Sequence, residues 1–422
     1  MYDAIVIGGG PAGMMAAGRA AERGKRVLLL EKNPTLGKKL LITGGGRCNV
    51  TNNKPEVRTM LGKYKKSDKF LFSAFTQFGV AETLKFFHDR GMETKEEAEG
   101  RIFPVSNSAQ SVWNVLTDYM KQGGVRIQTK AEVKSISFHT PSGEIIVTLL
   151  DKSTVRAHSC IVATGGTSRP ETGSTGEGFQ WLKKLGHAVV PNDVSLVPIT
   201  LKDLWSRKLA GVTLRDIKFT TFKNGAKQKV YKGKLLFTHV GISGPTVLNM
   251  SRDVGELLHS GEGSEYMSSP QKTEVVIMLD LFPALDSGAL REKLQAILVE
   301  QSNKKIKNIL PAFIAPALVD PILSLVNINS ETPSHSVRTN ERKALVSLLK
   351  AIPLNVKGLL GKDKAIVSSG GVVLNEVNFK TMQSRLIPQL YLVGDVLNID
   401  RPSGGYSLQL CWTTGYVAGS HC

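Results

Sequence analysis

The chain has 422 residues, with 54 Lys and Arg against 36 Asp and Glu, so its formal net charge is +18. A hydrophobic content of 41% excludes a disordered or fibrous chain, and the length predicts roughly two or three domains. No apolar run reaches the ~18 residues of a membrane span, the first strand leaves no room for a secretion leader, and the four cysteines form no disulfide framework. We therefore expect a cytoplasmic protein without a membrane segment, whose high positive charge calls for an anionic partner.

The beginning of the chain has the strand–helix–strand pattern of a dinucleotide-binding fold. A β-branched strand at 3–7 runs into the glycine turn GGGPAG at 8–13, and an alanine-rich helix is predicted over 14–23. A second buried strand at 26–30 ends at Glu31, whose carboxylate can accept both hydroxyls of an adenosine ribose and would repel the 2′-phosphate of NADP. The free N–H groups of the helix N-terminus would bind a pyrophosphate. This pattern alone leaves NAD and FAD open.

Three later segments suit FAD better than NAD. A second glycine triplet within 38–52 lies among cations and asparagines and can wrap a phosphate and reach a ring system. A buried strand at 160–163 runs into a glycine turn, and another at 390–393 ends in Gly394-Asp395 before a helix predicted over 408–418. An Asp at such a strand end can accept a hydroxyl from a ribityl chain, which NAD lacks. Since no second glycine motif opens another βαβ unit, NAD(P)H would visit the flavin only transiently.

Motifs spread over the whole chain resemble one family. They are KLLITGGGRCNVTN at 39–52, GRIFP at 100–104 with Ser106, GSTG at 173–176, LFTH at 236–239, GISGP at 241–245 and GGY at 404–406. They resemble the three-domain bacterial flavoprotein family that includes aminoacetone-oxidase-like enzymes and a ribosomal-RNA dihydrouridine synthase. The chain departs from that pattern at Asp395, where Glu is more usual, and at Ser407, where Asn is more usual. From the residue pattern and the resemblance together, the expected cofactor-binding residues are Gly8, Gly10, Pro11, Ala12, Gly13, Glu31, Lys32, Lys39, Thr43, Gly45, Gly46, Arg47, Asn49, Val133, Ala163, Thr164, Gly165, Gly394, Asp395, Gly405, Tyr406 and Ser407.

The predicted fold is α/β: a Rossmann-like FAD-binding domain, with a doubly wound and mostly parallel sheet, split by a β-rich and a helical insertion. Short strands predicted at 195–201, 216–222, 227–237 and 274–280 indicate a small antiparallel sheet or barrel. Leucines share one face after Ser287 and again after Asn340, each a plausible N-cap, which predicts helices. The expected domains are the FAD-binding domain at 1–192 and 360–422, the β-rich substrate domain at 193–285 and 351–359, and the helical domain at 286–350. The resemblance implies that both insertions lie above the flavin.

Three side chains are candidates for chemistry beyond the hydride transfer that a flavin supplies. Cys48 could donate the proton that saturation of a uracil C5=C6 bond needs, although a free cysteine is more often a small packed side chain. His239 lies in a glycine-rich turn and could serve the site, with a hydrogen-bonded turn histidine as the equal alternative. Arg101 could bind an anion or a carbonyl, or form a surface ion pair. No cluster of His, Cys and Asp has the spacing of a metal site.

The excess charge is concentrated in residues 201–240, which hold ten cations against two acids, a local net charge of +8. Such a surface would bind ribosomal RNA with steep salt dependence, or would be only a solvated basic face. We therefore expect an FAD-dependent oxidoreductase that reduces a uridine of ribosomal RNA to dihydrouridine. The alternative is oxidation of a small amine resembling aminoacetone, with O₂ reduced to H₂O₂. The oligomeric state is not set by the sequence.

Overall fold

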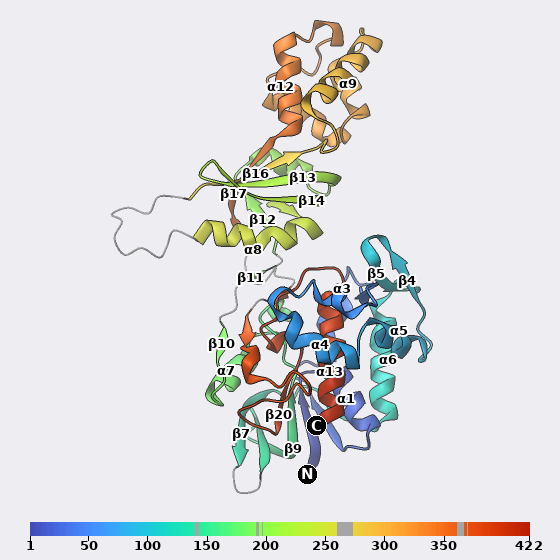
Figure 1. Cartoon of the computed structure of the whole chain (residues 1–422), viewed down its shortest axis with the longest axis vertical. Coiled ribbons are helices and arrows are strands. Elements are labelled where there is room, and N and C mark those ends of the chain that lie inside the picture. The colour runs from blue at the N-terminus through green and yellow to red at the C-terminus, as the bar shows by residue number, and fades with distance from the viewer. Residues whose placement is uncertain (140–142, 191–193, 196, 260–272, 361–366, 369) are drawn as a thin grey trace, which may run out of the picture. The chain divides into compact units, whose positions relative to one another are not determined.

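The computed structural model describes residues 1–139, 143–190, 194–195, 197–259, 273–360, 367–368 and 370–422. They form two compact units: the first unit comprises Met1–Ser195 with Lys362–Cys422, and the second unit is Leu196–Gly361 (Figure 1). The second unit holds both the strands and the helices of the insertion, so a separate helical domain at 286–350 stays a prediction. The boundary expected between 192 and 193 falls outside the described residues. Within the described ranges, no helix is both long enough and apolar enough to cross a bilayer.

A seven-stranded sheet forms the centre of the first unit. Its parallel part has the order β6 (Arg126–Gln128), β2 (Val27–Leu30), β1 (Tyr2–Ile7) and β9 (Thr154–Val162), with β20 (Leu390–Leu392) parallel to the end of β9. Antiparallel β8 (Glu144–Leu149) and β7 (Val133–His139) extend the sheet beyond β9. The predicted Rossmann-type fold with a mostly parallel sheet is therefore confirmed.

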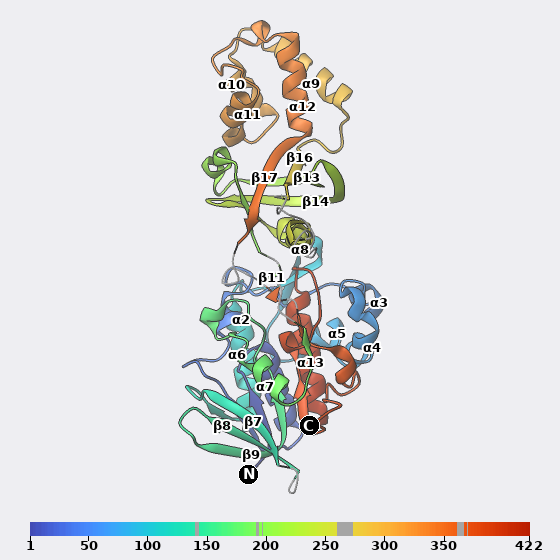
Figure 2. The same ribbon diagram turned by 90° about the vertical axis from the view of Figure 1, so that its left-hand side faces the viewer.

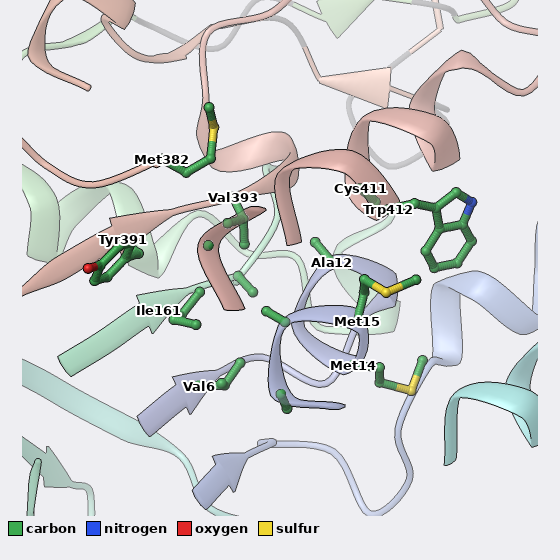
Figure 3. Packing of buried hydrophobic residues seen from close by; sticks show 14 of the residues in the cluster. Val6, Ala12, Met14, Met15, Ile161, Met382, Tyr391, Val393, Cys411 and Trp412 are labelled. Carbon is green, nitrogen blue, oxygen red and sulfur yellow. The ribbon is translucent and has the colours of Figure 1, made fainter. Parts of the chain in front are cut away.

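Two helices from opposite ends of the chain cover this sheet. Helix α1 (Pro11–Glu22) is rich in alanine, and α13 (Tyr406–His421) contacts it at very short range. A Cβ on Gly415 or Gly419 would lie 2.4 or 2.5 Å from a backbone oxygen of α1, so only glycine permits this approach. Met15 and Trp412 pack here with residues of the sheet in one buried cluster (Figure 3).

Smaller elements surround this core. The helices are α2 (Lys38–Ile42), α3 (Val57–Leu61), α4 (Asp68–Gln77), α5 (Val80–His88), α6 (Ala109–Gln122) and α7 (Glu177–Lys184). A three-stranded sheet has the order β3 (Thr51–Asn52), β5 (Arg101–Pro104) and β4 (Thr94–Glu97). Two short antiparallel pairs, β10 (Val189–Val190) with β19 (Gly371–Val372) and β11 (Val194–Ser195) with β18 (Val367–Ser368), join the segments that flank the insertion.

The second unit contains a closed antiparallel barrel, which confirms the predicted β-rich insertion. Its order is β12 (Ile199–Leu201), β15 (Gly241–Ser243), β14 (Ala226–Thr238), β13 (Thr213–Lys223), β16 (Val275–Asp280) and β17 (Ile352–Leu359). Helix α8 (Pro245–His259) follows β15 and was not predicted. A buried core of alternating barrel residues continues into the helices that follow.

The helices α9 (Ser287–Glu300), α10 (Ile306–Ile309), α11 (Val319–Leu325) and α12 (Thr339–Lys350) gather at one end of the barrel (Figure 2). Neither Ser287 nor Asn340, the two predicted N-caps, is the N-cap of its helix. Asp286 rather than Ser287 caps α9, because its carboxylate accepts the backbone N–H of Ala289 at 2.8 Å. Helix α12 begins at Thr339, and the side chain of Glu341 accepts the N–H of Arg338 at 2.7 Å.

Candidate functional site

A cavity of about 510 Å³ lies in the first unit at the carboxyl ends of β1 and β2. Its lining brings together segments from both ends of the chain, as expected for a dinucleotide site at the edge of a parallel sheet. The expected cofactor residues that line it are Gly8, Gly10, Pro11, Ala12, Glu31, Lys32, Lys39, Thr43, Gly45, Val133, Ala163, Thr164, Gly165, Gly394, Asp395 and Ser407.

The glycine turn before α1 gives this cavity its floor. Gly8 has φ +103°, and a Cβ there would lie 2.6 Å from the carbonyl oxygen of Ala163. A Cβ on Gly13 would lie 1.9 Å from the carbonyl oxygen of Gly8, so the third glycine serves the packing of helix on turn. Gly10 is different: it is the N-cap of α1, its side-chain position meets no atom within 4 Å, and it lines the cavity. The N–H groups of the first helical turn therefore face an open cradle.

Glu31 closes one side of the cradle. Its carboxylate is 8% exposed and accepts the N–H of Gly9 at 2.8 Å through Oε2. Its Oε1 accepts the backbone N–H of Asn33 at 2.8 Å and the Asn33 side-chain amide at 2.7 Å. These bonds fix the carboxylate beside the turn, with acceptor capacity left for a hydroxyl because each oxygen has two lone pairs.

A loop that the sequence did not assign to the site forms part of the wall next to Glu31. Residues 172–177 line the cavity, and Lys32 binds this loop through Thr175 at 2.8 Å and Glu177 at 3.0 Å. Lys39 donates to the carbonyl of Ser168 at 2.7 Å, and burial lowers the pKa of its ammonium. The GSTG motif at 173–176 marks this loop in the sequence, but the sequence did not give the motif a role in cofactor binding. The contacts of Lys32, the residue after Glu31, show that the loop lies at the Glu31 side of the cavity.

The far side of the cavity is formed by the segment after β20 and the start of α13. Asp395 and Ser407 both line the cavity, and both contact the guanidinium of Arg401. Arg401 was not predicted. Its side chain is only 1% exposed, and it also donates to the carbonyl of Ile399 at 2.8 Å. Asp395 and Ser407, the two departures from the family pattern, therefore meet at one buried cation.

Six expected cofactor residues do not line the cavity: Gly13, Gly46, Arg47, Asn49, Gly405 and Tyr406. Arg47 pairs instead with Glu97 and lies 4.2 Å from the centre of the Phe103 ring, so its guanidinium serves the β4–β5 hairpin. Gly405 has φ +99° and approaches the backbone of Thr51 so closely that a Cβ would lie 2.4 Å from it. The carbonyl of Tyr406 accepts a hydrogen bond from the buried hydroxyl of Tyr64 at 2.8 Å, at the start of α13.

The three chemical candidates lie in different surroundings. Cys48 is fully buried outside the lining, and desolvation raises the pKa of its thiol. Arg101 donates to the carbonyl of Ala98 at 3.0 Å and lies outside the lining. His239 is exposed, in the turn between β14 and β15 of the second unit.

The residues present fit FAD. The cradle at Gly10 would be filled by a Cβ, and the buried hydroxyl of Thr164 in the lining has no partner among the described residues. One cavity thus brings together the Glu31 carboxylate at the end of β2, the N-terminus of α1, and Asp395 with the Ser407 hydroxyl, the groups that a dinucleotide with a polyol chain requires. The start of helix α1 lies between Glu31 and the Gly394-Asp395 turn. The residue before its N-cap, Gly9, donates to Glu31, and a Cβ on Gly394 would lie 3.1 Å from the Cβ of Ala12.

Comparisons with known proteins identify the family of the chain. Residues 2–421 match the HI0933-like protein Rossmann domain family. The chain is 31% identical over 424 residues to the ribosomal RNA dihydrouridine synthase of Escherichia coli, covering 99% of this chain and 96% of that protein. It is 30% identical over 416 residues to the 3-dehydro-bile acid delta(4,6)-reductase of Clostridium scindens, covering 98% and 97%.

Among solved structures, the 3-ketosteroid delta1-dehydrogenase of Sterolibacterium denitrificans superimposes with a TM-score of 0.55 at 11% identity, covering 100% of this chain and 99% of that one. That likeness shows a shared fold. The family match over the whole chain and the cavity geometry together give the identity. The chain belongs to the HI0933-like Rossmann-domain family and is an FAD-dependent oxidoreductase.

Proposed function

We propose that this oxidoreductase reduces a uridine of ribosomal RNA to dihydrouridine. The observation that carries the proposal is a set of exposed, unpaired cations on the barrel, in a chain that is similar over its full length to a ribosomal RNA dihydrouridine synthase. Of the ten cations in 201–240, Lys218 pairs with Asp280 at 3.1 Å and Lys229 with Asp253 at 2.7 Å. Six others are exposed and form no salt bridge within the described part of the chain: Lys202, Arg207, Lys208, Arg215, Lys227 and Lys232.

Three of these six cations, Arg215, Lys227 and Lys232, lie on the hairpin formed by β13 and β14 (Figure 1), and Arg207 and Lys208 lie in the short helical turn before β13. Every residue from 224 to 230 is exposed, so the hairpin tip is open to a large anionic partner. Two aromatic residues of the hairpin are engaged within the second unit. Phe219 is fully buried in the barrel, and Tyr231 donates its hydroxyl to Asp253. We therefore expect RNA binding by this hairpin to rest mainly on phosphate contacts of its cations.

Within the first unit, we propose that Glu31 holds the adenosine ribose, the N-terminus of α1 the pyrophosphate, and Asp395 the ribityl hydroxyls. Bound FAD, once reduced, supplies the hydride, and NAD(P)H is the proposed transient reductant. Saturation of the uracil C5=C6 bond takes a hydride at one carbon and a proton at the other. Cys48, the sequence-based candidate for the proton donor, is disfavoured in this role because its thiol is buried outside the cavity lining.

RNA binding is tested by measuring the affinity for ribosomal RNA at several salt concentrations. Replacing Lys227 and Lys232 by Gln should reduce the slope of log affinity against log salt by about 1.4 to 1.8, since each phosphate contact contributes about 0.7 to 0.9. The matched control replaces Lys183 and Lys184, two exposed lysines of α7 in the first unit, and should leave the slope unchanged. All variants should keep their flavin absorbance.

The reaction itself is tested by nucleoside analysis of ribosomal RNA from a strain that lacks the protein. Loss of dihydrouridine supports the proposal, and an unchanged content refutes it. The amine-oxidase alternative would leave the exposed cations without a role. It predicts H₂O₂ formation from aminoacetone and an affinity for RNA that is absent or independent of salt.

A further inference from the structure

We propose that Arg401 is a positioning residue of the FAD site: its buried guanidinium orients Asp395 and Ser407 toward the cofactor and sets the electrostatic potential at that end of the cavity. The inference rests on the proposed contact between Asp395 and FAD. Arg401 does not itself line the cavity, and it acts through Asp395 and Ser407, which do.

The contacts of Arg401 define this role. One terminal nitrogen pairs with the carboxylate of Asp395, Nε donates to Oγ of Ser407 at 3.0 Å, and the other terminal nitrogen donates to the carbonyl of Ile399 at 2.8 Å. The planar fork of a guanidinium can hold all three acceptors at once, whereas an ammonium cannot match that geometry. Because the side chain is 1% exposed, solvent cannot replace these bonds.

Asp395 and Ser407, the two side chains that accept from Arg401, lie on different elements of the first unit. Asp395 lies in the turn after β20 and Ser407 in the first turn of α13, so Arg401 fastens the strand end to the helix start across the loop between them. Both acceptors line the cavity, while the guanidinium lies behind them. Without Arg401, each side chain would be free to turn away from the cofactor.

The charges around Asp395 predict the electrostatic effect. The carboxylate is 16% exposed and is compensated by Arg401, while the ammonium of Lys39 is close enough to interact with both. Losing the guanidinium would leave the largely buried carboxylate beside the cofactor without its ion-pair partner and with only the more distant ammonium of Lys39 to compensate it. Reduction adds negative charge to a flavin, so the loss of a nearby cation disfavours the reduced form.

The test measures the dissociation constant for FAD and the reduction potential of the bound flavin in a double-mutant cycle. Arg401→Met and Asp395→Asn should each weaken FAD binding by about 10- to 100-fold. Because Arg401 acts through Asp395, the double variant should bind FAD at most about threefold more weakly than Asp395→Asn alone. Independent effects would multiply, so that the double variant would bind FAD at least about tenfold more weakly than Asp395→Asn alone, and this result would overturn the proposal.

The reduction potential of the bound flavin distinguishes an electrostatic effect of Arg401 on the cofactor from a merely structural role. Arg401→Met should shift the potential to more negative values, Asp395→Asn to more positive values, and the double variant back toward the wild-type value. Arg401→Lys should restore the potential but only part of the affinity. Shifts of the same sign for the two single variants, or a wild-type affinity and potential in Arg401→Met, would refute the role of Arg401.

Arg90→Met is the matched control, because Arg90 is also a partly buried, ion-paired guanidinium of the first unit but lies outside the FAD cavity. It should change neither FAD affinity nor potential. If Arg401→Met does not fold, the double variant still tests the proposal, since it removes both charges of the buried pair. If Asp395→Asn alone leaves FAD binding unchanged, the proposed placement of FAD fails; if Asp395→Asn weakens binding and Arg401→Met does not, only the role of Arg401 fails.

Discussion

Gly10→Ala should separate FAD binding from folding. Gly10 has φ −80° and ψ −177°, which alanine adopts freely, and its added Cβ would meet no protein atom within 4 Å. The methyl group would project into the cavity and keep a phosphate from the first-turn N–H groups of α1. Loss of one hydrogen bond to a charged acceptor, about 1.5 to 3 kcal/mol, corresponds to an FAD dissociation constant roughly 10- to 150-fold higher.

The assay is a fluorescence titration of the FAD-free protein, combined with urea unfolding of the same sample. Gly10→Ala should lower the unfolding free energy by no more than about 1 kcal/mol, the scale of an N-cap change. Gly13→Ala should destabilise the fold by several times as much, because its Cβ would overlap the carbonyl oxygen of Gly8. Gly24→Ala is the control: its φ of +80° costs about 1–2 kcal/mol in stability, with no change in FAD affinity. Wild-type FAD affinity in a folded Gly10→Ala protein would refute the proposed phosphate cradle.

Three further predictions concern buried polar groups. Glu31→Gln replaces one carboxylate oxygen by an amide donor, which would face the N–H group of either Gly9 or Asn33. FAD affinity should therefore fall about tenfold or more and the unfolding free energy by about 1–3 kcal/mol, measured by the same titration and urea unfolding. Gln409→Leu removes the acceptor of the Thr51 hydroxyl and the amide that donates to Thr83, Thr413 and the carbonyl of Gly79, although these last three groups keep another hydrogen bond. The unfolding free energy should fall by about 2–4 kcal/mol, and a loss below about 1 kcal/mol would contradict the network. Burial raises the pKa of the Cys160 thiol above its ordinary value of 9.0, so the thiol of the unfolded chain ionises at lower pH than that of the folded chain. The unfolding free energy should therefore fall as the pH rises above about 9, by up to ~1.4 kcal/mol per pH unit. Cys160→Ala should weaken this pH dependence, measured by urea unfolding from about pH 7 to 10.5.

The parts of the site that follow local pattern could be predicted from the sequence. The turn at 8–13 and the acid at Glu31 depend on residues close in the chain, and Asp395 follows a recognisable buried strand. Helix α8 could have been found, because Val247, Met250 and Val254 recur at helical spacing after a proline at the first helical position.

The parts that depend on distant contacts could not be predicted. Arg47 follows a glycine triplet that suggested a position beside the flavin ring, yet its guanidinium pairs with Glu97, fifty residues away. Arg401 lies in an irregular loop where no periodicity marks it as buried, and its importance appears only when Asp395 and Ser407 converge on it. An arginine in such a loop is typical of a solvent-exposed side chain, and only tertiary contact reverses that expectation.

The antiparallel pair β11–β18 has a consequence for how this enzyme can diversify. Val194 pairs with Ser368 and Ser195 with Val367, so the chain leaves the first unit and returns to it through neighbouring strands. The second unit has its own buried core, and the cavity is lined by residues of the first unit alone. Such a connection allows the barrel and its helices to change by mutation, or to be replaced, while the residues that line the cavity stay the same. The two parts of this chain can therefore diverge at different rates, each keeping its own buried core.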